Sequence, residues 1–185
     1  MHPASLRCAV ALLIVVFLAA GCGGSGGSSS SAKVSPDKYV ATVCSAISPL
    51  ERDVVTRSSA LNNTTATNAT QAKRTLQGFL TAVEQDSASA LSKIQSAGTP
   101  DISGGKAVAG TIVKAFTELR DAMKVALTRS DSLPTGSPTA FKSAAQALGA
   151  SVRGSLNNID SSGLSNRDLE KAAAGQAACK SLSNG

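Results

Sequence analysis

Apolar side chains recur at intervals of three and four residues over most of this 185-residue chain. Residues at that spacing lie on one face of an α-helix, so each such stretch predicts an amphipathic helix. Only 3% of the residues are aromatic, whereas 31 are alanine and 27 are serine. Strands favour aromatic and β-branched residues, and small side chains suit close helix contacts. The pattern therefore predicts an all-α protein rather than a β-sandwich.

Helix caps and helix breakers divide this pattern into four long helices and a short fifth one. Pro49 interrupts the first of them, which predicts a kink or a restart near Ser48. Four amphipathic helices joined by short loops form an antiparallel four-helix bundle, and the short C-terminal helix would be added to it. The predicted helices cover about 35–61, 70–97, 105–131, 138–159 and 166–182.

The N-terminal segment has the features of an export signal. An unbroken apolar run of 13 residues from Cys8 to Ala20 follows Arg7, and it is too short to span a membrane, which takes about 20 residues. The run ends in Leu-Ala-Ala-Gly before Cys22, which resembles a bacterial lipobox, although leucine stands four residues before the cysteine instead of the more usual three. Cys22 is therefore the predicted lipidation site, and the alternative is an ordinary secretory signal that leaves a free thiol there.

These features divide the chain into three parts. Residues 1–21 are the predicted lipoprotein signal peptide, and residues 22–35 are the lipidated cysteine and a flexible Gly/Ser tether. Residues 36–185 are the predicted helical bundle domain. The expected location is the outer face of a bacterial cytoplasmic membrane, with secretion if the lipobox is not used.

Two cysteines remain after the signal peptide and the lipidated residue are set aside. They are Cys44 and Cys179, near the two ends of the predicted domain. An even pair in an exported protein predicts a disulfide, here one that joins the last helix to the first. Two unpaired buried thiols are the alternative, and a redox-active pair would more often have Cys-x-x-Cys spacing.

Composition excludes several classes of activity. The only histidine is His2, in the predicted signal peptide, so the mature chain would lack Ser-His-Asp and Cys-His catalysis and histidine-based metal sites. We expect no enzyme activity, no metal and no cofactor. The net charge of +6 comes from scattered residues, which argues against nucleic-acid binding. A weak attraction to an anionic membrane or wall polymer is compatible with it.

Three other groups of residues are weaker candidate sites. Gly104, Gly105 and Lys106 stand where the third helix begins, and backbone amides at a helix N-terminus can bind an anion. Glu118 and Asp121 share a helix face, where solvent-exposed ion pairs explain them better than a metal or acid–base site. A lipid-sized groove could also open beside the aromatic residues, namely Tyr39, Phe79, Phe116 and Phe141.

Several short motifs together make the chain resemble small helical lipoproteins and secreted proteins of actinobacteria. Besides the lipobox and tether, they are Val43-Cys44-Ser45-Ala46-Ile47, Ala97-Gly98-Thr99-Pro100, the run from Gly104 to Ala109, and Ala178-Cys179-Lys180-Ser181-Leu182. The resemblance covers most of residues 37–182. It implies a helical domain anchored in the cell envelope, and it brings no catalytic residues.

The sequence thus predicts a membrane-anchored envelope lipoprotein that acts as a non-enzymatic interaction or structural module. Its expected partners are the membrane, through the N-terminal lipid, and an unidentified envelope protein or polymer. The alternative function is a carrier or binding protein that holds an apolar or cell-envelope ligand between its helices. The oligomeric state does not follow from the sequence.

Overall fold

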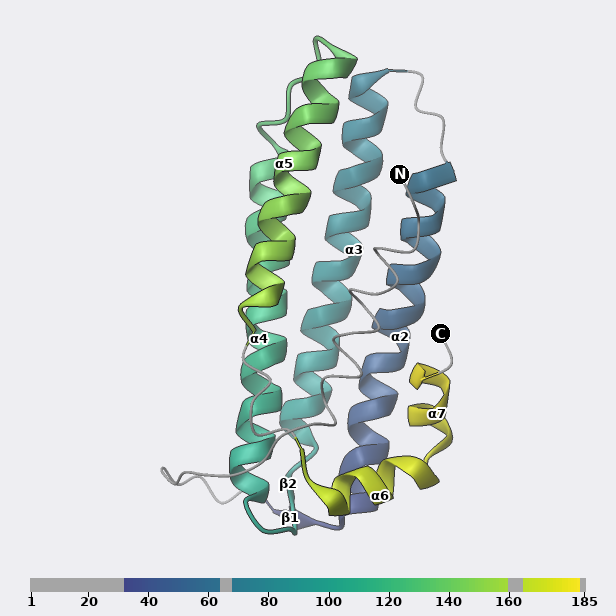
Figure 1. The fold of residues 1–185 in the computed structure, drawn as a ribbon, viewed down its shortest axis with the longest axis vertical. Coiled ribbons are helices and arrows are strands. Elements are labelled where there is room, and N and C mark those ends of the chain that lie inside the picture. The colour runs from purple at the N-terminus through teal and green to yellow at the C-terminus, as the bar shows by residue number, and fades with distance from the viewer. Residues whose placement is uncertain (1–31, 64–67, 160–164, 184–185) are drawn as a thin grey trace.

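The computed structural model describes residues 32–63, 68–159 and 165–183. Within these residues the chain forms six helices and two very short strands (Figure 1). The all-α class predicted from the apolar spacing is confirmed. In chain order the elements are β1 (Lys33–Val34), α2 (Pro36–Asn63), α3 (Ala69–Ser96), β2 (Thr99–Pro100), α4 (Gly105–Ser130), α5 (Pro138–Asn157), α6 (Arg167–Gly175) and α7 (Ala177–Ser183).

The four long helices lie along the longest axis of the molecule (Figure 1). α3 packs against α2 on one side and α4 on the other, and α5 packs mainly against α4. The two short helices α6 and α7 cover the N-terminal half of α2. Most of the core therefore lies between α2, α3 and α4, where the largest buried apolar side chains are Tyr39, Leu50, Leu80, Val83, Leu91, Ile94, Val108, Ile112, Phe116 and Met123.

α2 continues through Pro49, so the predicted restart of the helix at that point is wrong. The hydroxyl of Ser48 does not cap a new helix; it donates a hydrogen bond of 2.8 Å to the carbonyl of Cys44. Proline removes one backbone hydrogen bond from a helix. Ala46 and Leu50 are buried on either side of it, and this packing against neighbouring helices keeps the helix continuous.

The C-terminal segment forms two helices where the sequence predicts one. α6 ends at Gly175, Gln176 is extended with φ −93° and ψ 125°, and α7 begins at Ala177. Glycine disfavours a helix, which makes this position a natural break. The side chain of Asn166 caps α6 by accepting hydrogen bonds from the amides of Asp168 and Leu169.

A short parallel bridge between β1 and β2 attaches the N-terminal segment to the turn before α4. The amide of Thr99 donates to the carbonyl of Ala32 at 3.0 Å, and the amide of Asp101 donates to the carbonyl of Val34 at 2.8 Å. Gly98 has φ +87°, and a Cβ there would lie 2.7 Å from the Ala32 carbonyl oxygen. Lys33 and Val34, which the sequence predicts to belong to the tether, thus form part of the fold.

Candidate functional site

The structure joins Cys44 of α2 to Cys179 of α7 by a disulfide, the pairing that the sequence predicts. The two Cα atoms lie 5.1 Å apart, although the residues are 135 positions apart in the chain. The bond attaches the C-terminal helix directly to the first long helix. Cys22, the predicted lipidation site, lies outside the described residues, as does the whole predicted signal peptide.

The glycine pair before α4 has a packing role. Gly104 is the N-cap residue with φ +70°, in the left-handed region that favours glycine. A Cβ on Gly105 would overlap the carbonyl oxygen of Pro100, and the Gly105 amide donates to the carbonyl of Ile102 at 3.1 Å. Lys106 is exposed in the first turn of α4. Anion binding by these three residues stays a prediction, and close approach of β2 to α4 accounts for Gly105.

The acidic pair on α4 is in ion pairs, although Asp121 pairs with Arg120 and not with Lys124, the flanking lysine expected from the spacing. Glu118 lies 3.8 Å from Lys114, and Asp121 lies 2.7 Å from the neighbouring Arg120. Both pairs are exposed on α4, where such ion pairs contribute little to stability. Among the described residues, no group of three or more His, Cys, Asp or Glu side chains is placed to hold a metal ion.

Two aspartates that are not among the predicted site residues, Asp53 and Asp86, meet between α2 and α3. The buried Oδ2 atom of Asp86 has no hydrogen-bond partner in the structure, and the Asp53 carboxyl group faces it and forms a 2.9 Å ion pair with Arg57. Burial raises the pKa of Asp86, and the nearby charge of Asp53 raises it further, while the charge of Arg57 opposes the shift. Sequence spacing cannot reveal this pair, because its members lie on different helices.

Among the described residues, Tyr39 is the most deeply buried aromatic residue, with 1% of its surface exposed. Burial raises the pKa of its hydroxyl to about 12, and that hydroxyl has no hydrogen-bond partner in the structure. Phe116 is buried as well, whereas Phe79 and Phe141 are half-buried against the core. The aromatic residues therefore pack into the core, and none of them lines the groove described next.

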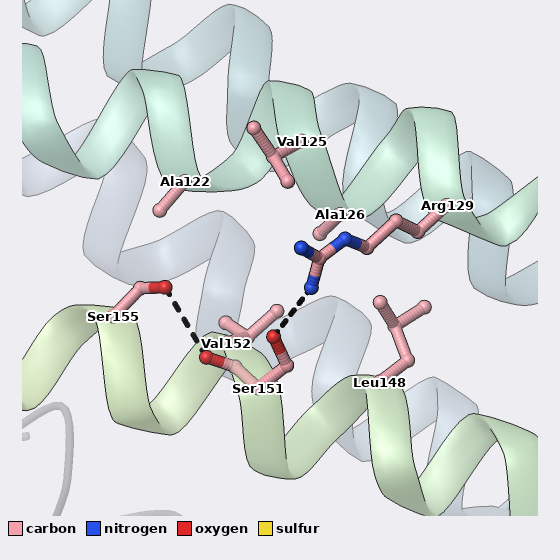
Figure 2. Close-up of a pocket in the computed structure, with 8 residues that line it drawn as sticks. All are labelled: Ala122, Val125, Ala126, Arg129, Leu148, Ser151, Val152 and Ser155. Carbon is pink, nitrogen blue, oxygen red and sulfur yellow. Dashed lines mark hydrogen bonds between the residues drawn. The ribbon is translucent and has the colours of Figure 1, made fainter.

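A shallow groove lies between α4 and α5 (Figure 2). It encloses about 170 Å³, part of which is open solvent. The guanidinium group of Arg129 crosses it and donates a hydrogen bond of 2.7 Å to the hydroxyl of Ser151. Val125 on its wall is 49% exposed. Its lining, called the α4–α5 groove below, is Ala122, Val125, Ala126, Arg129, Leu148, Ser151, Val152 and Ser155.

None of the described helices is both long enough and apolar enough to cross a membrane. Comparisons of the chain with protein-family models, curated proteins and solved structures find no match. The resemblance to actinobacterial lipoproteins therefore continues to rest on the motifs in the sequence.

Proposed function

We propose that the protein is a lipoprotein on the outer face of a bacterial cytoplasmic membrane, where it presents a non-enzymatic interaction module. In this proposal Cys22 carries the lipid, and α2 to α5 act as an antiparallel four-helix bundle. The observation that carries the proposal is the β1–β2 bridge. It attaches the chain to the fold at Lys33, eleven positions after the lipobox cysteine. A lipid anchor at Cys22 would therefore hold one defined end of the domain next to the membrane.

The length of the tether supports this arrangement. Residues 23–31 are all glycine or serine, and nine such residues have an r.m.s. reach of about 17 Å. α4 begins beside β2 and is 26 residues long, which corresponds to about 39 Å. The C-terminal end of α4 would thus point away from the membrane. Partners in the envelope would meet that far end and the sides of the helices.

The size of the α4–α5 groove favours an interaction module over the alternative of a ligand carrier. Sites for small molecules usually enclose about 300–1,000 Å³. The comparable volume of this groove is about 10 Å³, which is close to the space of one water molecule. Its lining combines five apolar side chains with two serines and an arginine that hydrogen-bonds to one of them. Lipid extraction and mass spectrometry of the protein from its native envelope test the carrier function, which requires a stoichiometric lipid.

A pair of cysteine substitutions tests the membrane anchor. Cys22→Ser should accumulate the precursor or release the protein from the membrane fraction, because two acyl chains anchor stably and none remain. Cys8→Ser is the matched control, since Cys8 lies within the apolar run of the predicted signal. That variant should stay in the membrane fraction. If Cys22→Ser is cleaved to the mature length and still fractionates with the membrane like the unmodified chain, lipidation at Cys22 is wrong. Crosslinking in intact cells is the separate experiment that would identify the proposed protein or polymer partner in the envelope.

A further inference from the structure

α5 is the least buried of the four long helices, although it is 20 residues long. Leu148 is its one buried side chain, whereas α3 has seven buried residues and α4 has eight. Its other apolar residues, including Phe141, Val152 and Leu156, are half-buried at the edge of the core. Apolar burial is the main term that holds a helix to its neighbours, so α5 is held more weakly than α3 or α4.

The α4–α5 groove shows where the packing of α5 is incomplete. Val125 remains 49% exposed even though α5 lies beside it. Among the described residues, two large apolar side chains are exposed, Val55 and Val125, and Val125 is the more exposed of them. The hydrogen bond from Arg129 to Ser151 crosses the groove between exposed side chains (Figure 2). An exposed hydrogen bond contributes little net stability, because water can replace either partner. Neither feature holds α5 firmly in place.

The backbone of α5 is also weakened by two glycines. A Cβ at Gly154 would meet no atom within 4 Å, and one at Gly149 would meet only the Arg153 guanidinium, at 3.8 Å. Neither glycine is therefore required by close packing. Glycine inside a helix lowers its stability relative to alanine, so both residues make α5 easier to unfold or displace.

The connection from α4 to α5 is fixed at one end and exposed at the other. The Lys73 ammonium group of α3 donates to the carbonyls of Asp131 and Leu133 at 2.7 and 3.3 Å. Leu133 is itself buried. These contacts hold the C-terminal end of α4 against α3. The next residues, 134–137, are all exposed, so they can change conformation without disturbing α4.

We propose that α5 detaches from α4 and loses its helical hydrogen bonds locally, while α2, α3 and α4 stay folded, because a detached helix of 20 residues is only marginally stable in water. The opening uncovers a strip of α4 that the closed form covers in part, formed by Ala122, Val125 and Ala126. This local opening is a property of the fold, and it goes beyond the proposed function because it holds whether or not the chain carries a lipid.

Hydrogen–deuterium exchange of the full mature chain tests the opening with two matched substitutions. In the unmodified chain, α5 peptides should exchange at least about tenfold faster than central α3 peptides. Gly110→Ala places alanine in α4, where a Cβ meets no atom within 4 Å. α4 is folded in both the closed and the α5-open forms, so this change should slow exchange in α3 and α4 about fourfold to fivefold and leave α5 unchanged.

Gly154→Ala acts on α5 itself and should slow exchange there by about the same factor. Neither alanine creates a clash, so both variants should fold. If Gly110→Ala slows α5 and α4 equally, α5 exchanges only through global unfolding and the proposal is wrong. Equal exchange rates of α5 and α3 in the unmodified chain, or no effect of Gly154→Ala on α5, would also overturn it.

Discussion

Removal of the Cys44–Cys179 disulfide should lower the stability of the domain by a large fraction of its total. The bond joins α2 to α7 and encloses α3, α4 and α5 between its ends. The unfolded chain is therefore closed into a loop that contains nearly the whole domain. The perturbation is the double substitution Cys44→Ser and Cys179→Ser, which removes the crosslink and leaves no unpaired thiol at either position.

The size of the effect follows from the length of that loop. With 135 positions between the cysteines, the loss of chain entropy in the unfolded state corresponds to about 5 kcal/mol at 25 °C. This value is an upper bound, because α6 and α7 also gain freedom in the folded state once the bond is gone. Their buried side chains are few: Leu169, Ala172 and Leu182. Folded domains have unfolding free energies of about 5–15 kcal/mol, so the crosslink is a large part of the total.

Urea unfolding followed by far-UV circular dichroism measures the difference. With a slope of about 2 kcal/mol per molar urea, a loss of 3–5 kcal/mol lowers the midpoint by about 2 M. The reduced unmodified chain is the control, and it should match the double serine variant if packing of the serines adds nothing. A loss below about 1 kcal/mol with an unchanged slope would refute the loop-entropy argument.

Two substitutions test contacts that the structure adds to the sequence. Burial and Asp53 raise the pKa of Asp86, so the folded chain binds this proton more tightly than the unfolded chain, and stability falls as the pH rises through that pKa. Asp86→Asn should raise the unfolding free energy at pH 7 by about 1 kcal/mol, and the stability of this variant should fall less as the pH rises. A pH profile of stability that is the same in the variant and the unmodified chain would contradict this prediction. Gly105→Ala should lower the unfolding free energy by about 1–3 kcal/mol in thermal or urea unfolding, because the added Cβ overlaps the Pro100 carbonyl. The control Gly110→Ala should not destabilise the chain, because a Cβ there meets no atom within 4 Å. Equal effects of the two substitutions would contradict the packing role of Gly105.

Local chemistry explains why the helices can be predicted from the sequence. The Ser137 hydroxyl accepts a hydrogen bond from the amide of Ala140, and Pro138 stands at the first position of α5, as the capping pattern predicts. α3 and α4 begin and end within about two residues of their predicted limits, because caps and glycines act within a single turn. The disulfide pairing also follows from counting, since two cysteines remained.

Contacts between distant residues account for what the sequence does not predict. Backbone atoms form the β1–β2 bridge, so no side-chain pattern in the sequence predicts it. Pro49 remains helical because its neighbours are buried, which is a tertiary effect. Asp53 and Asp86 meet only after α2 packs on α3, and spacing within one helix cannot show that. The α4–α5 groove likewise arises from how two helices fit together.

The β1–β2 strand pair and the disulfide connect parts of the fold that are distant in sequence, and α5 lies outside both connections. The β1–β2 bridge fixes the N-terminal segment to the α3–α4 turn, and the disulfide fixes α7 to α2. Neither of them involves a residue of α5, which has one buried side chain and two glycines. A lipid at Cys22 would act close to β1. Loss of α5 packing would therefore leave the anchored end folded, because β1 and β2 adjoin the well-buried helices α3 and α4. The helices that follow α5 in the chain, α6 and α7, stay on α2 through their packing and the disulfide.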